Sequence, residues 1–377
     1  MTYLKKFGVL VALCLLAALA LVACGDSTAT PSSGSSTTAA ATGASGSTSA
    51  KTGGPAAGGK TLKVGLVTDI GQLNDKSFNQ AAWAGVQKAQ TDLGAQVKAI
   101  ETKSTNDYAT NINQFVTDKY DVIVTVGFLM QDATLAAAKA NPGIKFIGVD
   151  QGYADAPANL AGLVFEEDKS GFLAGALAAG MSKNHKIAAV LGTKSVPAVA
   201  RFGEGYKAGA AYLDKTFPDL VAKSTTEAKQ VYHADGDTAF SDPSWGAGQA
   251  TSLIQAGYDV IFGAGGKTGN GAIEAAADAG NYVIGVDDDQ YLTLATEDPK
   301  ITAKILSSAQ KLITPGVFNI IQTVSAGTFK SGSNIGPVAL APFHDLEATI
   351  PAPLKDALVK INSGLADGSI KTGVNIK

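Results

Sequence analysis

Short apolar runs alternate with segments of helical spacing along the chain from Lys60 onward. The runs are TLKVGLVTD (61–69), DVIVTVGF (121–128), KFIGVD (145–150), NLAGLVF (159–165), KIAAVLG (186–192), DVIFGAGG (259–266) and NYVIGVDDD (281–289). Most are continuously apolar, which is typical of parallel strands buried on both faces. Helical patterns cover segments between them, such as 77–93, 172–181, 202–213 and 246–256. This alternation predicts α/β units built on a parallel sheet.

The order of these features repeats within the chain. A first series runs from Leu62 to Asp150 and a second from Lys186 to Asp287, and they end on the similar phrases FIGVDQ and VIGVDDDQ. We therefore expect two doubly wound lobes of like design, with a single larger sheet as the alternative. Because open parallel sheets bind ligands beyond the carboxyl ends of their strands, two such lobes would enclose a cleft between those ends.

The N-terminus has the pattern of a secretory signal. Lys5 and Lys6 precede the apolar run Val9–Val22, and the phrase LVACG then brings in Cys24. A run of about 14 apolar residues is too short for a spanning helix, which needs roughly 20. We expect residues 1–23 to be a lipoprotein signal peptide, because the cysteine after the cleavage site is similar to a bacterial lipobox and would be diacylated. An ordinary signal peptide with a chance cysteine is the alternative.

The segment from Cys24 to Lys60 is rich in Ser, Thr, Ala and Gly and has almost no charge or large apolar residue. Such a composition cannot bury enough surface to offset its ordering entropy, so residues 24–60 are interpreted as a flexible tether. Whether the tether carries glycans is open. Cys14 and Cys24 are the two cysteines. No disulfide is therefore expected in the mature chain, and the core alone must stabilise the fold.

Composition limits the ligands and the kinds of function. The chain has 377 residues and a net charge of −3, so it lacks a basic footprint for nucleic acid. Arg201 is its single arginine; a highly charged anion is therefore a less favoured ligand, although lysines and helix N-termini also bind anions. His185, His233 and His344 have no metal-ligand spacing and no G-x-S-x-G elbow is present, so we expect no enzyme, metal or cofactor. Residues 287–289 are the alternative metal site.

The stretch TDIGQLNDKSFNQAAW joins the first strand to the first helix. Ser77 is expected to cap this helix, and Gln80 to complete a capping box. Phe78 is either the first residue of the buried helical face or an aromatic at the helix mouth, and periodicity favours the buried face. Trp83 lies off that face and is expected to pack at its edge. Asp69 would either accept hydrogen bonds from a ligand or close the loop through an Asx-turn.

The phrase GAGGKTGNG, starting at Gly263, invites comparison with a phosphate-binding P-loop. That motif requires a glycine five positions before Gly266, where this chain has Ile261. We therefore exclude a P-loop and expect a glycine-rich turn whose free N–H groups approach a ligand closely. A tight turn that binds nothing is the alternative.

Taken together, these motifs resemble the basic membrane protein family of substrate-binding lipoproteins, which serve ABC importers and include purine nucleoside receptors. The resemblance runs from about Leu62 to the C-terminus and rests on TDIGQLNDKSFNQAAW, IVTVGF, NLAGLVFEEDKSGFLAGALAAGMSK, DVIFGAGGKTGNG, VIGVDDDQ and ILSSAQK. It implies the type I periplasmic binding protein architecture, with two Rossmann-like lobes, three hinge crossovers and closure around the ligand. We expect residues 61–165 with about 291–328 in the N-terminal lobe, and 166–290 with about 329–377 in the C-terminal lobe.

The resemblance also implies a set of ligand-binding residues on both lobes. They are Asp69, Phe78, Asn79, Gly127, Phe128, Phe240, Gly265, Asp287 and Lys311. A purine base would be stacked between the rings of Phe78 and Phe240, because every base has a π-face. Trp245 and Phe202 are rivals for the second ring. The VGF motif would line the opposite wall.

Polar positions of the family pattern divide between base and sugar. Asp69 and Asn79 match positions that read base edges, since a carboxylate accepts from ring N–H groups and an amide both donates and accepts. The ribose is expected near Gly265, Asp287 and Lys311. Asp287 would accept from two sugar hydroxyls, and Lys311 would donate to them and offset the acid.

The chain departs from the family pattern at two positions. Leu312 follows the lysine of ILSSAQK, where the family often has a basic residue, and Asp288 replaces the commoner serine after Asp287. Both departures leave room for a different ligand. We expect a monomeric, extracytoplasmic, membrane-anchored lipoprotein that captures a nucleoside and hands it to a membrane permease. A sensor for a membrane signalling partner and an exported nucleoside hydrolase are the alternatives.

Overall fold

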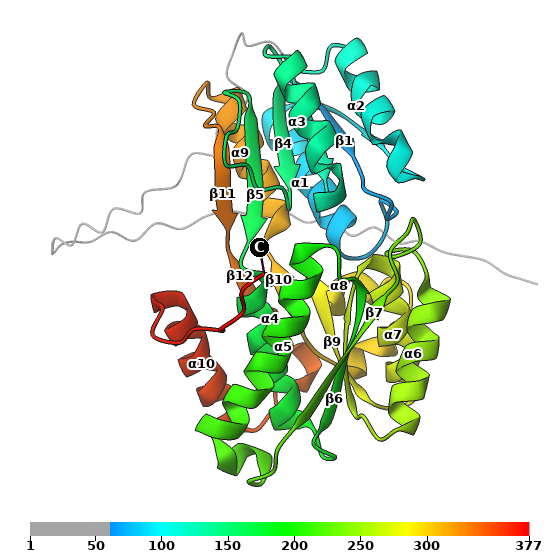
Figure 1. Ribbon diagram of the computed structural model, residues 1–377, viewed down its shortest axis with the longest axis vertical. Coiled ribbons are helices and arrows are strands. Elements are labelled where there is room, and N and C mark those ends of the chain that lie inside the picture. Colours follow the sequence, from blue (N-terminus) through cyan, green and yellow to red (C-terminus); the bar gives the residue numbers. More distant parts are fainter. Residues whose placement is uncertain (1–60, 377) are drawn as a thin grey trace, which may run out of the picture. The chain divides into compact units, whose positions relative to one another are not determined.

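The computed structural model describes residues 61–376. The expected signal peptide, the lipidation at Cys24 and the tether lie outside the described residues. Within 61–376, no helix is long and apolar enough to cross a membrane. These residues form two lobes, each built on its own six-stranded sheet, so the alternative of one larger sheet is wrong (Figure 1).

The sheet of the N-terminal lobe is entirely parallel, with strand order β11-β5-β4-β3-β1-β2. Its strands are β1 (Lys63–Val67), β2 (Gln96–Ile100), β3 (Val122–Val126), β4 (Lys145–Val149), β5 (Leu160–Phe165) and β11 (Gly332–Gly336). The central strands are buried nearly throughout, as expected for continuous apolar runs. Edge strand β2 alternates between exposed and half-buried positions.

Two helices cover each face of this sheet. They are α1 (Phe78–Leu93) and α9 (Ile313–Ser325) on one face, and α2 (Tyr108–Thr117) and α3 (Gln131–Ala140) on the other. Residues such as Val86 and Val317 pack against Val124 in the first core, and Ile112 and Phe115 lie in the second. The lobe is therefore a doubly wound three-layer unit, as its sequence pattern predicts.

The sheet of the C-terminal lobe has the order β12-β10-β9-β8-β6-β7, and its edge strand β12 is antiparallel to β10. The strands are β6 (Lys186–Thr193), β7 (Glu227–His233), β8 (Val260–Ala264), β9 (Tyr282–Asp287), β10 (Ile305–Lys311) and β12 (Val338–Leu340). The two lobes thus share a strand order, because β5-β4-β3-β1-β2 of the first sheet corresponds to β10-β9-β8-β6-β7 of the second. This similarity is the structural counterpart of the repeated phrases in the sequence.

The helices of the C-terminal lobe also form two layers. They are α4 (Glu167–Met181), α5 (Pro197–Thr216) and α10 (Ala352–Asp367) on one face, and α6 (Pro243–Gln255) and α7 (Gly266–Asp278) on the other, with a short α8 (Gln290–Leu294). Short 3₁₀ helices occur in both lobes. They are Thr105–Asp107 and Phe128–Met130 in the N-terminal lobe, and Pro218–Val221, Ile301–Lys304 and His344–Leu346 in the C-terminal lobe. Helices α4 and α5 pack so closely that a Cβ on Gly175 would lie 1.8 Å from the Tyr206 carbonyl oxygen. Glycine there permits the backbone contact.

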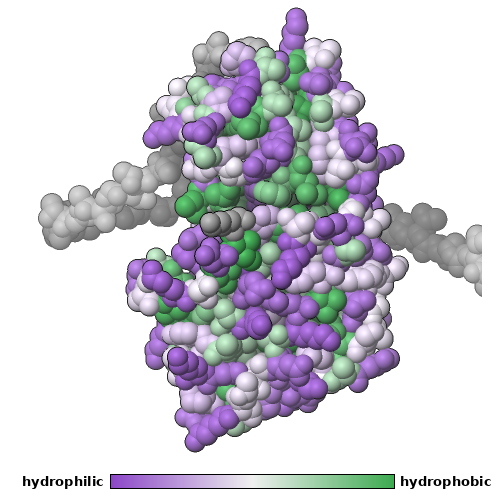
Figure 2. Space-filling view, in the orientation of Figure 1, coloured by the Kyte–Doolittle hydropathy of each residue, from purple (hydrophilic) through white to green (hydrophobic). Residues whose placement is uncertain are grey.

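The chain passes between the lobes three times, as the resemblance implies. The crossings follow β5, β10 and β11. The expected boundaries in the last third are wrong, because β10 within 291–328 belongs to the C-terminal sheet and β11 beyond 328 belongs to the N-terminal sheet. The exchange points are Leu312 and Pro337, whose backbones are joined by a hydrogen bond from the Leu312 N–H to the Pro337 carbonyl (3.0 Å). Figure 2 shows hydrophobic side chains gathered along the level where the lobes meet.

Candidate functional site

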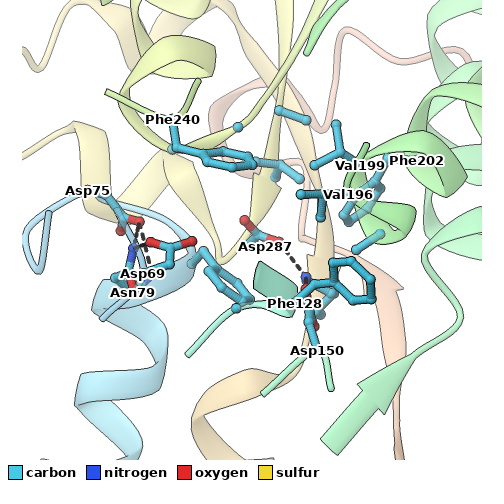
Figure 3. A pocket seen from close by; sticks show the side chains of 18 of the residues that line it. Asp69, Asp75, Asn79, Phe128, Asp150, Val196, Val199, Phe202, Phe240 and Asp287 are labelled. Carbon is cyan, nitrogen blue, oxygen red and sulfur yellow. Dashed lines mark hydrogen bonds and ion pairs between the residues drawn. The ribbon is translucent and has the colours of Figure 1, made fainter. Parts of the chain in front are cut away.

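A cavity lies between the lobes, at the carboxyl ends of both sheets. Its empty space is about 560 Å³, counting the part that opens to solvent. The nine residues predicted for a ligand site all line this one cavity: Asp69, Phe78, Asn79, Gly127, Phe128, Phe240, Gly265, Asp287 and Lys311. Figure 3 shows acids and an amide at one end, around Asn79, and an apolar wall around Val199 at the other. The carboxyl-end rule for parallel sheets locates this cavity.

Three charged side chains meet where β4, β9 and β10 end. The Lys311 Nζ lies 2.6 Å from Asp150 Oδ2 and 3.4 Å from Asp287 Oδ1, and the side chains of all three residues are buried. Burial by itself would lower the pKa of Lys311, but the carboxylates of Asp150, Asp287 and Glu167 outweigh it and raise that pKa. Burial raises the pKa of Asp150, and Lys311 opposes this effect. The lysine therefore stays charged and holds both aspartates in place.

Equivalent strands of the two lobes end at residues with positive φ. Gly127 after β3 and Gly265 after β8 have φ of 106° and 137°, and Asp150 after β4 and Asp287 at the end of β9 have φ of 60° and 64°. Aspartate is among the residues that tolerate this region. At Gly265 a Cβ would also lie 2.5 Å from the Gly192 nitrogen, so the expected glycine-rich turn is required by close backbone contact.

Asp75, rather than Ser77, caps helix α1. The Asp75 carboxylate accepts hydrogen bonds from the backbone N–H groups of Ser77 (3.0 Å), Asn79 (2.9 Å) and Gln80 (3.1 Å). The Ser77 hydroxyl instead donates to Asp287 Oδ2 in the other lobe (2.7 Å). The Gln80 Oε1 has no hydrogen-bond partner within the described residues. The expected capping box is therefore wrong, because a carboxylate two residues upstream satisfies the same N–H groups.

Asn79 is fixed between two carboxylates. Its Nδ2 donates to Asp69 Oδ1 (2.9 Å) and to Asp75 Oδ2 (3.1 Å), and Asp69 Oδ1 also accepts from the Gly71 N–H (2.7 Å). Because ionised carboxylates only accept, the amide must turn its NH₂ group toward both acids and its Oδ1 away from them. Burial raises the pKa of Asp69 to about 6 and that of Asp75 to about 7, although these hydrogen bonds act in the opposite direction.

Phe78 has both of the roles that the sequence left open. It lines the cavity, and it also packs against the core of the N-terminal lobe. The Lys311 Nζ lies 4.4 Å from the centre of its ring, so a cation covers part of this aromatic surface. Trp83 packs against the same core, as expected.

Two of the three candidates for the second ring line the cavity. Phe240 packs against core residues of both lobes, and Phe202 is nearly buried with its ring 6.0 Å from that of Phe262. Trp245 does not line the cavity and makes an edge contact with His233 at 4.7 Å. Within 61–376, no ring contact joins Phe78 to Phe240. The two rings therefore do not close the cavity by stacking on one another.

Sequence reasoning missed several residues of the cavity. Asp150 occupies the place in FIGVDQ that Asp287 occupies in VIGVDDDQ, so the internal repeat held a signal for it. Val196 and Val199 form part of the apolar wall at the start of α5. They were missed because that helix was expected to begin five residues later, at 202, and begins at Pro197.

The Arg201 side chain forms an ion pair and a hydrogen bond within the C-terminal lobe. Its Nη1 lies 3.3 Å from Glu167 Oε2, and its Nη2 donates to the Ile376 carbonyl (3.4 Å). Glu167 is buried, which raises the pKa of its carboxyl to about 7. The chain's one guanidinium therefore serves an internal ion pair.

The alternative metal site at residues 287–289 is wrong. Asp287 contacts Ser77 and Lys311, whereas Asp289 Oδ2 lies 2.7 Å from His344 Nε2, so the carboxylates face different partners. Throughout the described part of the chain, no group of three or more His, Cys, Asp or Glu could hold a metal ion.

Two doubly wound lobes, three crossings and a cavity at the facing strand ends define a type I solute-binding protein. Residues 62–335 match the family model described as ABC transporter substrate-binding protein PnrA-like. The chain belongs to this family, also called Bmp, as the resemblance indicated.

Named relatives and solved structures agree. The chain is 32% identical to the ABC transporter nucleoside-binding protein BmpA of Lactococcus lactis, over 82% of this chain and 88% of that protein. It is 32% identical to basic membrane protein A of Borreliella burgdorferi, over 75% of this chain and 78% of that protein. A solute-binding protein of an ABC transporter system from Aeropyrum pernix K1 superposes with a TM-score of 0.73 at 23% identity, over 82% of this chain and 92% of that one. The family description makes this chain an ABC transporter substrate-binding protein, a class of protein that acts outside the cytoplasm.

Proposed function

We propose that this substrate-binding protein captures a nucleoside, preferentially a purine nucleoside, and delivers it to the permease of an ABC importer. The observation that carries the proposal is a cavity in which aromatic rings and buried acceptor oxygens lie together. The name of the lactococcal relative, a nucleoside-binding protein, supports the same ligand class.

The acceptors of the cavity call for a ligand rich in donors. Within the described residues, Oδ1 of Asn79 and Oδ1 of Asp150 are buried without a hydrogen-bond partner, and Oδ1 of Asp287 has the Lys311 ammonium at 3.4 Å but no hydrogen bond. A buried acceptor left without a donor is costly, so a ligand that supplies hydroxyl and N–H groups there is favoured. We assign the sugar hydroxyls to Asp150 and Asp287, beside Lys311, and the base edge to Asp69 and Asn79. Phe78 and Phe240 then supply the stacking surfaces.

The charges of the cavity favour a neutral nucleoside over a nucleotide. Asp69, Asp75, Asp150 and Asp287 line it, while Lys311 is the cation among its lining residues. A phosphate would bring further negative charge into a buried, acidic environment, where Coulomb repulsion is poorly screened.

Anchoring completes the proposal. The lipobox-like phrase around Cys24 supports a lipoprotein held at the outer face of the membrane, with residues 24–60 between the anchor and the lobes. A receptor placed there can meet the permease without diffusing away.

Calorimetry on the purified protein tests the ligand. We expect heat of binding with guanosine, inosine or adenosine, weaker binding of cytidine and uridine, and little with guanosine monophosphate or free ribose. Mass spectrometry of small molecules carried through purification gives an independent reading. Absence of heat with all five nucleosides would reject the nucleoside assignment while leaving the family intact.

A further inference from the structure

The loop that precedes α1 is held by the C-terminal lobe through its backbone. The Asp75 carbonyl accepts a hydrogen bond from Asn270 Nδ2 (2.7 Å). The next carbonyl, that of Lys76, accepts from Thr293 Oγ1 (2.8 Å) and from Gln290 Nε2 (3.2 Å). Three side chains of one lobe thus grip two consecutive carbonyls of the other.

Hydrogen bonds within the C-terminal lobe hold two of these side chains, Asn270 and Gln290, in position. Gln290 is fully buried; its Oε1 accepts from the Val286 N–H (2.9 Å), and its Nε2 also donates to Asn270 Oδ1 (2.9 Å). Asn270 lies within the glycine-rich phrase GAGGKTGNG and Gln290 ends VIGVDDDQ, so both belong to motifs of which other members line the cavity. Neither amide lines the cavity itself, and neither does Thr293.

The Lys76 side chain adds a second grip across the lobes. Its Nζ donates to Thr296 Oγ1 (3.2 Å) and lies 3.4 Å from Glu297 Oε1. Lys76 also has φ of 59°, a conformation that costs a non-glycine residue energy and persists when surrounding contacts hold it. The adjacent Ser77 reaches Asp287 in the cavity (2.7 Å). Seating this loop therefore also positions a cavity acid.

We propose that Asn270, Gln290 and Thr293 form a closure latch that grips the backbone of residues 75–76 and sets the lifetime of the bound ligand without touching it. The inference rests on the proposed function, since it assigns the latch to nucleoside capture. The partners lie on different lobes, so their bonds exist only when the lobes are together, and a ligand can leave only when they part. Each latch bond therefore favours the closed state independently of what the cavity holds.

The test uses the full chain and three variants. Thr293→Val removes the hydroxyl that donates to the Lys76 carbonyl at nearly constant volume, and Lys76→Met removes the ammonium of the second grip, which the same loop carries; these two are called the latch variants. Thr251→Val is the matched control, because its exposed hydroxyl bonds Ala247 within α6. We expect guanosine to dissociate roughly 2- to 10-fold faster from each latch variant, the usual worth of one hydrogen bond, with an unchanged association rate. Small-angle scattering of the ligand-free variants should show a larger radius of gyration than wild type.

The two readouts separate the latch from the ligand. Unchanged dissociation and scattering in both latch variants would overturn the latch, even if their melting temperatures fall. If no protein binds a nucleoside but the ligand-free latch variants expand, the latch stands and the nucleoside assignment fails. If Thr251→Val matches the latch variants in either readout, the effect is nonspecific and the latch is rejected.

Discussion

A single amide sets the expected preference among purines. The contacts to Asp69 and Asp75 leave Asn79 Oδ1 as an acceptor, and Asp69 Oδ2 is a second acceptor nearby in the cavity. An edge with two donors suits this pair, and guanine offers N1–H and the 2-amino group, whereas hypoxanthine offers N1–H alone. We expect guanosine to bind about fivefold more tightly than inosine, or about 1 kcal/mol for one more hydrogen bond. Calorimetry measures the difference, and inosine binding as tightly as guanosine would contradict this arrangement.

Asp69 makes nucleoside binding depend on pH. Burial raises the pKa of this carboxyl from 3.8 to about 6 in the ligand-free protein, and an N–H donor from the ligand favours its ionised form. Binding below that pH must expel the proton, so the dissociation constant should be nearly constant above about pH 7 and rise by up to about tenfold per unit below about 6. Titrations between pH 5 and 8 check this; Asp69→Asn should bind more weakly but lose this group's part of the slope.

The same shift affects stability with the opposite sign. The folded state holds the Asp69 proton more tightly than the unfolded chain, so this group's contribution falls as pH rises from 3.8 to about 6. An ionised Asp69 above that range is a cost of about 3 kcal/mol that the site carries. A carboxylate kept at such a cost is consistent with selection for binding rather than for stability.

Phe78 is the residue on which the stacking proposal depends most. Phe78→Ala removes one ring face and should weaken nucleoside binding by about 1–3 kcal/mol, while the fold persists because the side chain is half-buried. Phe329→Ala is a suitable control, since this half-buried ring lies against Lys145, away from the cavity. Equal affinities of Phe78→Ala and wild type would return Phe78 to a packing role alone.

At the scale of single residues, the motifs of the sequence predicted which side chains line the cavity but not the hydrogen bonds between them. Ser77 and Gln80 fit a capping box on spacing, yet Asp75 satisfies the helix because its carboxylate reaches three N–H groups at once. Spacing rules cannot rank two candidate caps that lie two residues apart. Asp150 was within reach of the internal repeat, whereas Val196 depended on a helix start that periodicity placed too late.

Among the elements, the turn from β8 to α7 combines a positive φ with a close backbone contact at Gly265. Gly265→Ala places a Cβ 2.5 Å from the Gly192 nitrogen at φ of 137°, so either the strand ends separate or the turn changes. We expect a loss of several kcal/mol of stability and weaker ligand binding. Gly280→Ala is the matched control, because its φ is also positive, 85°, but its Cβ would meet nothing within 4 Å. Thermal melts of both variants check the difference; equal losses would show that strain alone, and not the close contact, matters.

Apolar runs in the sequence predicted strands that are covered on both faces of a sheet. The seven continuous apolar runs all contain strands, because central parallel strands are covered on both faces. Strands β2 and β7 at the sheet edges have mixed, half-exposed patterns that a search for apolar runs passes over. Helix α4 begins at Glu167, ahead of the expected 172, because its first turn is acidic while its later turns are apolar on all sides. Charged first turns suit helix N-termini.

At the scale of the whole molecule, neither lobe is a continuous piece of chain. Strand β11 and helix α9 return to the N-terminal lobe, and β10 and β12 lie in the C-terminal sheet. The resemblance implied three crossings, but the later ones were placed wrongly, because neither β10 (ILSSAQK) nor β11 (GSNIG) is a continuous apolar run. Two of the crossings lie beside the cavity, since Lys311, which lines it, ends β10 and its Nζ lies 5.6 Å from the ring of Phe165, which ends β5. Lys311 therefore belongs both to the cavity wall and to a strand end at a crossing.

In the proposed function the lobes are held near the membrane, and Cys24 is the proposed point of attachment. Cys24→Ser should abolish incorporation of a labelled fatty acid when the full chain is expressed in a bacterial host, because a hydroxyl cannot replace the thiol that is acylated. Cys14→Ser is the matched control, since Cys14 is the other cysteine and lies within the apolar core of the expected signal. It should label like wild type. Label retained on Cys24→Ser, or lost from Cys14→Ser, would show that the anchor is not at Cys24, while nucleoside binding by the purified lobes would be unaffected in either case.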